Sequence, residues 1–182
     1  MYFERSGKDN TEKTILAAKK RAEQLNIKEV VIASTTGESA YKALEIFNDI
    51  SLTVVTYHCG FKKPFETVMK EEVKKDLIKK GACVVSATHA LSGVERSISK
   101  KFSGAYPALI IADTLRLFGQ GTKVAVEIAI MAADAGTLSG KDIVSIGGTG
   151  RGADAALVLK PASQSDFFDI KIREIICKPS NF

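Results

Sequence analysis

Short apolar segments alternate with amphipathic segments along the chain, and this alternation restricts the possible folds more than any other feature of the sequence. Apolar segments rich in β-branched residues, expected to be strands, occupy residues 29–34, 52–56, 82–88, 143–146, 157–159 and 168–177. Segments with helical periodicity occupy residues 10–25, 37–47, 67–80, 107–118 and 123–135. The pattern predicts a three-layer α/β/α fold around a mostly parallel sheet of about five to six strands with an antiparallel edge.

The size and charge of the chain limit its organisation and its partners. Its 182 residues, 45% of them hydrophobic, are enough to bury one core, so residues 1–182 are expected to form a single domain. The net charge of +5 is compatible with nucleic acid, but the lysines lie in mixed-charge helical segments and aromatic residues do not alternate with them. We therefore expect a small anionic ligand and no nucleic acid.

Three widely spaced cysteines, Cys59, Cys83 and Cys177, lack the paired spacing of a zinc site or of a disulfide framework. No signal-peptide pattern follows Met1, and no apolar run reaches the roughly 18 residues that a membrane helix needs. We expect a cytoplasmic protein that binds no metal and contacts no membrane.

A glycine-rich segment connects the expected strands 143–146 and 157–159. It begins with Gly147, Gly148, Thr149, Gly150 and Arg151. Glycine lets the backbone approach a ligand closely, and the Thr149 hydroxyl and the Arg151 guanidinium suit a phosphate group. The segment is predicted to bind a ligand, with a flexible hairpin connection as the alternative. It does not form a dinucleotide-binding fingerprint, because the glycines precede a strand and not a helix.

A second polar segment follows the first expected strand and opens a helix. Its ligand-binding candidates are Ser34, Thr35, Thr36, Gly37 and Ser39. The N-terminus of a helix presents unpaired backbone N–H groups and the positive end of the helix dipole, which together attract an anion. We predict a phosphate site here. Ordinary helix capping by Thr36, with Ser39 as its partner, is the alternative.

The two histidines of the chain, His58 and His89, each follow an expected strand. Because ligands of open α/β sheets bind beyond the carboxyl ends of the strands, we predict that both histidines contact the ligand. The alternative is that each donates a hydrogen bond to a loop carbonyl. The polar, turn-rich segment 90–98 that follows His89 is interpreted as a lid.

Glu127 is the one charged residue in the apolar stretch 125–131. We favour a structural position at the exposed edge of its helix. The alternative is a carboxylate held in place to pair with a cation or with a ligand hydroxyl.

Together these motifs resemble the C-terminal domain of pyruvate kinase, an allosteric domain that binds a sugar-phosphate effector in many pyruvate kinases. The resemblance rests on the first polar segment, residues 34–40, on residues 136–142 and on the glycine-rich segment. It implies that Ser34, Thr36, Ser39 and residues 148–152 hold phosphate. Thr35 and Glu38 stand where that effector loop often carries basic residues, so one phosphate is expected and not two. The catalytic barrel of pyruvate kinase has no counterpart here, so phosphoryl transfer is not implied.

Nearly the whole chain is similar to small stand-alone proteins, mainly archaeal, that are named after the pyruvate kinase α/β domain. The motifs are residues 7–11, 89–94, 126–136 and 147–154. This resemblance implies flavin mononucleotide as the cofactor. Its ribityl chain is expected to contact hydroxyl and imidazole groups, Ser92 among them. Its ring is expected to lie against Leu91, Val94 or Tyr57.

Three classes of function follow from these features. The first is a protein that binds a phosphorylated small ligand, flavin mononucleotide, with any reaction unidentified. The alternative is a non-catalytic sensor of a phosphorylated metabolite. The third is a hydrolase with His58 or His89 as base and Ser92 or Cys59 as nucleophile, but no motif spacing supports it. Whether the protein is an enzyme therefore stays open, and a homo-oligomer is expected because the pyruvate kinase domain packs against copies of itself.

Overall fold

A computed structural model describes residues 1–182 and contains every strand and helix expected from the sequence, with ends shifted by a few residues. The strands are β1 (Tyr2–Arg5), β2 (Glu29–Ala33), β3 (Ser51–Thr56), β4 (Cys83–Ser86), β5 (Ile143–Gly147), β6 (Ala155–Lys160) and β7 (Lys171–Asn181). The α-helices are α1 (Thr11–Gln24), α2 (Glu38–Ile46), α3 (Glu71–Lys79), α4 (Gly93–Phe102), α5 (Pro107–Arg116) and α6 (Gln120–Asp134). Two 3-10 turns, η1 (Lys8–Asn10) and η2 (Gln164–Asp169), complete the fold.

The strands form one seven-stranded sheet in the order β1-β7-β6-β5-β2-β3-β4. Strands β5, β2, β3 and β4 are parallel, as predicted, and the antiparallel pairs β5–β6 and β6–β7 lie toward the β1 side. Strand β1 and helix α4 are the α or β elements that the sequence pattern missed, since the segment containing the start of α4 was expected to be turn-rich. Only Phe3 of the four residues of β1 is buried, so β1 lacks the apolar run that marks the other strands.

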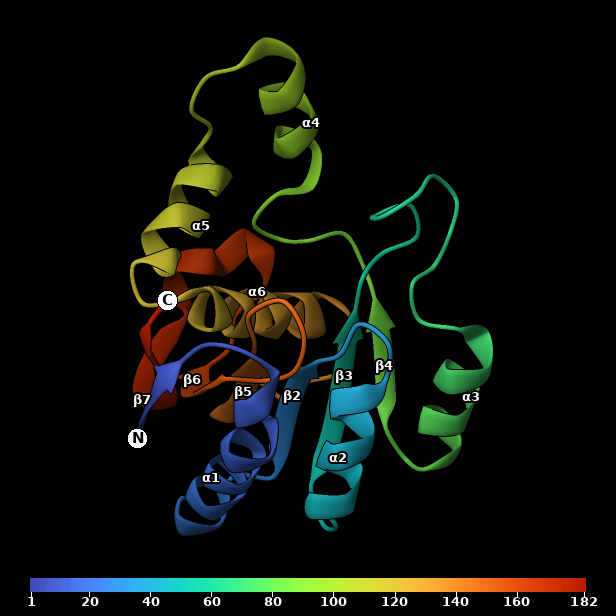
Figure 1. Ribbon diagram of the computed structural model, residues 1–182, viewed down its shortest axis with the longest axis vertical. Helices are drawn as coiled ribbons and strands as arrows, with labels where there is room; N and C mark the ends of the chain where they lie inside the picture. Colours follow the sequence, from blue (N-terminus) through green and yellow to red (C-terminus); the bar gives the residue numbers. More distant parts are fainter.

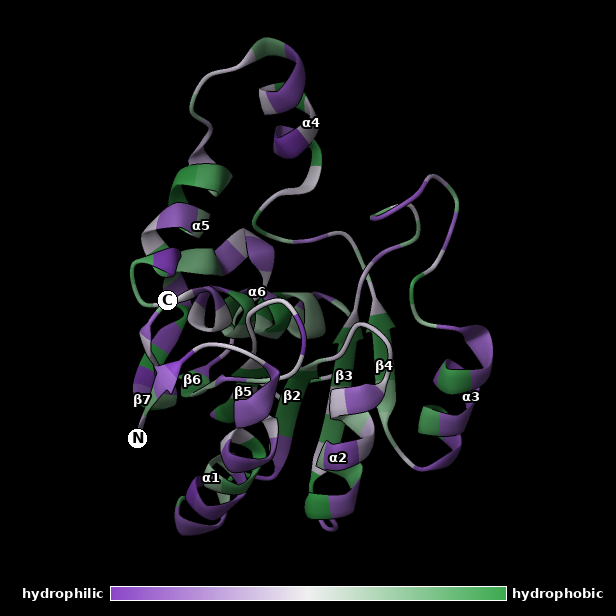
Figure 2. Ribbon diagram, in the orientation of Figure 1, coloured by the Kyte–Doolittle hydropathy of each residue, from purple (hydrophilic) through white to green (hydrophobic).

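Helices cover both faces of the sheet, which confirms the three-layer architecture (Figure 1). On one face, Ile15 of α1 and Leu77 of α3 belong to the same apolar cluster as Val30 of β2. On the other face, Val126 of α6 packs in a cluster with Val31 of β2. Neighbouring residues of one strand thus face opposite layers, which is why most residues of the central strands are apolar (Figure 2). None of the helices combines the length and apolarity needed to cross a bilayer.

The segments that follow β2, β3, β4 and β5 all leave the sheet at the same end (Figure 1). Helix α6 crosses the sheet behind them, and α4 and α5 extend beyond that end. Parallel pairing therefore brings together the polar segments that the sequence places after separate strands.

Candidate functional site

A cavity of about 820 Å³ opens at the carboxyl ends of the central strands. Its walls come from the β2–α2 segment, the end of β3 and the loop after it, the residues after β4, helices α4 and α6, and the glycine-rich segment. The residues singled out from the sequence that line this cavity are Ser34, Thr35, Thr36, Ser39, Tyr57, His89, Glu127, Gly148, Gly150, Arg151 and Gly152. The two phosphate-binding candidates, far apart in the sequence, thus face a common space.

Leu91 does not line this cavity, contrary to the expectation that it forms part of a ligand wall. Its side chain is 3% exposed and belongs to the core between α6 and the sheet. His58 and Ser92 also lie elsewhere, since they line a smaller cavity of about 220 Å³ between the loop after β3 and α4. The segment from Ala90 to Ser92 turns the apolar Leu91 toward the core, which separates Ser92 from the larger cavity.

Three further candidates shape the site without lining it. Gly37 and Gly147 are buried, and a Cβ at either position would collide, with Val73 at the first and with the backbone of Gly121 at the second. Thr149 lies within the glycine-rich segment with its Oγ1 buried. Close packing therefore explains why these two positions are glycine.

The β2–α2 segment presents backbone donors to the cavity. Gly37 precedes α2 with a φ of 98°, and no side chain caps the helix, so the capping role proposed for Thr36 is wrong. Ser34 Oγ accepts the Ala40 N–H at 3.3 Å. The N–H groups of Thr36, Gly37, Glu38 and Ser39 have no acceptor within the protein. A helix N-terminus in this state is suited to an anion.

The glycine-rich segment connects the antiparallel strands β5 and β6, and hydrogen bonds tie its C-terminal end to residues near the N-terminus. The Gly7 N–H donates to Asp154 Oδ2 at 2.9 Å, and the Ala153 N–H donates to Thr11 Oγ1 at 3.1 Å. Gly152 has a φ of 81° and leaves no room for a Cβ beside Thr11. Burial raises the pKa of Asp154, against the effect of the Gly7 hydrogen bond. These partners lie more than 100 residues away in the sequence, so local reasoning does not find them.

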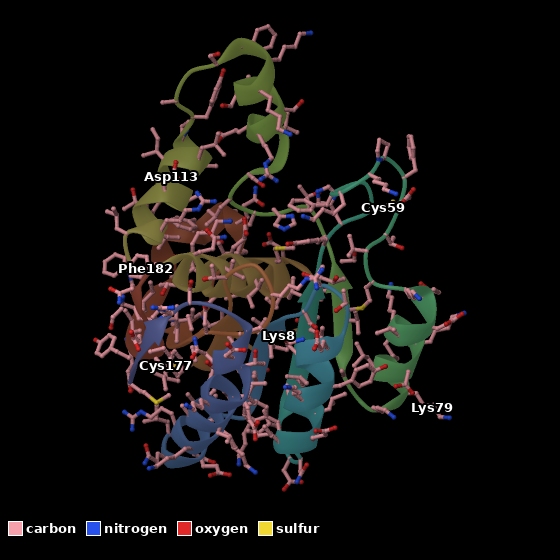
Figure 3. The ribbon with its side chains drawn as sticks, in the orientation of Figure 1. Lys8, Cys59, Lys79, Asp113, Cys177 and Phe182 are labelled. Atoms are coloured by element: carbon pink, nitrogen blue, oxygen red, sulfur yellow. The ribbon has the colours of Figure 1, made fainter.

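The cavity carries an excess of positive charge. Its two carboxylates are each paired with a lysine, Glu38 with Lys8 beside the first turn of α2 (Figure 3) and Glu127 with Lys123. The cations that line the cavity and have no carboxylate partner are Lys62, Arg96, Lys100 and Arg151. An anionic ligand is therefore favoured over a neutral or cationic one.

Glu127 is buried, 2% exposed, which corrects the expectation that it lies at an exposed helix edge. Its Oε2 lies 2.5 Å from Lys123 Nζ, and its Oε1 accepts the Leu91 N–H at 3.0 Å. Burial lowers the pKa of Lys123, while Glu127 opposes that shift. The alternative, a carboxylate that pairs with a cation, is the one observed.

The two histidines lie together, with ring centroids 5.6 Å apart, in an aromatic group with Tyr57 and Phe61. His89 stacks on Phe61 with ring centroids 4.6 Å apart, and the ring centroids of Tyr57 and Phe61 are 4.1 Å apart. Tyr57, Phe61 and His89 all line the larger cavity. Phe61 has no local signal in the sequence, because it lies in a loop with no periodic pattern.

Acidification is expected to destabilise the protein through His89. Burial lowers the pKa of His89 below its ordinary value of 6.5, so the unfolded chain takes up the proton first as the pH falls. Stability at pH 7.5 is therefore expected to exceed that at pH 5.5 in urea unfolding, and His89→Gln is expected to reduce this difference. His58→Gln is the control and retains the difference. Equal pH dependence in wild type and His89→Gln would contradict this assignment.

The fold and the position of the cavity define an α/β domain of the doubly wound kind, with its pocket at the carboxyl edge of the sheet. The family model described as "Pyruvate kinase, alpha/beta domain" matches residues 12–159, and the chain belongs to this family.

Similar solved structures include a pyruvate kinase from Cryptosporidium parvum, with 14% identity and a TM-score of 0.44, covering 84% of this chain and 23% of that chain. A Cryptosporidium parvum pyruvate kinase in complex with ADP has 16% identity and a TM-score of 0.41, covering 89% of this chain and 23% of that chain. The chain thus spans less than a quarter of the length of these enzymes.

Proposed function

We propose that this protein is a non-catalytic binding module that senses a phosphorylated metabolite in the 820 Å³ cavity. The observation that carries the proposal is the charge balance of the cavity wall. Four cations there lack a carboxylate partner, namely Lys62, Arg96, Lys100 and Arg151, whereas both carboxylates are neutralised by lysines. The family is named after the α/β domain of pyruvate kinase. Effector binding by that domain supports a sensor role for this chain.

The phosphate group is proposed to bind at the N-terminus of α2. The free N–H groups of the β2–α2 segment supply donors there, and the hydroxyls of Thr36 and Ser39 line the same part of the cavity. Arg151 approaches from the glycine-rich segment. Charge-assisted hydrogen bonds to phosphate are the strongest that such a site can form.

A sensor is preferred to a hydrolase because no nucleophile is paired with a base. His58 Nδ1 lies 2.7 Å from the Cys59 carbonyl oxygen, and neither imidazole is hydrogen-bonded to the Ser92 hydroxyl or to the Cys59 thiol. A nucleophile activated by histidine requires that contact.

Flavin mononucleotide is the second candidate ligand, and the aromatic group favours it. The Tyr57, Phe61 and His89 rings form an apolar wall on which a planar ring can stack. Absorbance near the flavin bands in the purified protein distinguishes this ligand from a colourless metabolite.

Thr36→Ala is expected to weaken the binding of inorganic phosphate by about 1–2 kcal/mol, the contribution of one hydrogen bond to a charged group. Titration calorimetry measures this loss. Thr67→Ala is the matched control, because Thr67 is also exposed but does not line the cavity. Equal phosphate affinity in the two variants would place the phosphate elsewhere.

A further inference from the structure

Helix α4 stands apart from the sheet and its covering helices (Figure 1). None of its residues is buried, and Val94 and Phe102 are 74% and 68% exposed. Helices in globular proteins are stabilised mainly by burying an apolar face, and α4 buries none. Packing therefore does little to fix its position.

Both ends of α4 have backbone conformations that favour a hinge. Gly93 at its start has a φ of 41°, and Ser103 and Gly104 directly after it have φ values of 59° and 99°. A Cβ added at Gly93 would meet only Thr88, and one at Gly104 only Tyr106, both at ordinary contact distances. Neither glycine is closely surrounded, so a change of backbone conformation there meets little steric resistance.

One face of α4 is cationic and turned toward the cavity. Arg96 and Lys100 are four residues apart, so they lie on the same side of the helix, and both line the 820 Å³ cavity. They also line the 220 Å³ cavity that separates α4 from the loop after β3. This second cleft gives the helix space to move toward the loop.

Few contacts hold α4 in its observed position. Glu95 Oε2 accepts the Ala108 N–H at the start of α5 at 2.9 Å, and α5 itself is anchored by the buried Ala112. The Arg96 guanidinium lies 5.2 Å from the centre of the Phe61 ring. Both contacts are at its first turns, so the Phe102 end is the less restrained.

We propose that α4 is a hinged arm that closes over the cavity when a phosphorylated ligand binds, and that Arg96 and Lys100 contact the ligand's phosphate from it. The inference rests on the proposed function. Without an anion, Arg96, Lys100 and Arg151 repel one another across the cavity mouth. A bound phosphate removes that repulsion and attracts the arm, so its position reports whether the ligand is present.

The test combines a distance measurement with calorimetry. Spin labels at Phe102→Cys on α4 and Glu45→Cys on α2 report the position of the arm, in a chain whose exposed thiols are removed by Cys59→Ser and Cys83→Ser. Cys177 is buried and stays. Inorganic phosphate is the probe. On saturation the distance between the labels is expected to shorten and its distribution to narrow.

Arg96→Gln and Lys100→Gln are each expected to weaken phosphate binding about tenfold and together to abolish the change in distance. Lys101→Gln is the matched control. It removes the same charge from the next residue, which does not line either cavity. If phosphate binds and the distance between the labels does not change, α4 does not close over the cavity, and the proposed function is unaffected. Absence of phosphate binding in the unsubstituted chain overturns both.

Discussion

Glu127→Ala is expected to destabilise the fold by about 3–5 kcal/mol, because it leaves Lys123 as an unpaired buried charge. It also removes the acceptor of the Leu91 N–H, a second buried polar group. Urea unfolding followed by circular dichroism measures the loss. A change below about 1 kcal/mol would mean that Lys123 reaches solvent or another partner.

Two controls separate the buried pair from a general effect of charge removal. Glu38→Ala removes the other carboxylate of the cavity, whose partner Lys8 is about half exposed, and little change in stability is expected. The double variant Lys123→Met with Glu127→Leu replaces both charges by apolar side chains and is expected to recover most of the lost stability. No recovery would show that the ion pair itself, and not an unpaired charge, determines the stability.

Gly148→Val is expected to abolish phosphate binding. A Cβ at Gly148 would collide with the carbonyl oxygen of Gly152, so the glycine-rich segment has to open and Arg151 moves with it. Calorimetry with inorganic phosphate measures binding, and circular dichroism confirms that the variant is folded.

Gly140→Ala is the control for the loss of a glycine as such. Gly140 also lies outside helices and strands, with a φ of 82°, but a Cβ there meets no neighbour and the residue does not line the cavity. It is expected to lower stability slightly and to leave phosphate affinity unchanged. A folded Gly148→Val that binds phosphate as tightly as Gly140→Ala would rule out a role for the glycine-rich segment.

The sequence predicted the central sheet because β2, β3 and β5 are buried on both faces and so are rich in apolar, β-branched residues. It missed β1 and α4 for the opposite reason. β1 buries Phe3 alone and α4 buries no residue, and the serines and lysines of α4 look like those of a turn-rich segment. Periodicity reports burial, so an element that buries little leaves no pattern.

The sequence identifies phosphate-binding candidates where the polar residues stand next to one another in a short segment. Ser34, Thr36 and Arg151 lie in short segments next to strands and all line the cavity. Arg96 and Phe61 reach it from an exposed helix and a long loop, and only the tertiary arrangement brings them there. The pairing of Glu127 also has a local signal in the sequence, since Lys123 precedes it by four residues on the same helix face.

We propose that the 820 Å³ cavity recognises a phosphate group on a small molecule. The most direct measurement is titration calorimetry with matched pairs of compounds that differ only in phosphate, namely glucose 6-phosphate with glucose and flavin mononucleotide with riboflavin. We expect saturable binding of at least one phosphorylated member and none of its partner, with the affinity falling as salt rises. Binding of neither phosphorylated compound, or equal binding of both members of a pair, would contradict phosphate recognition by this cavity.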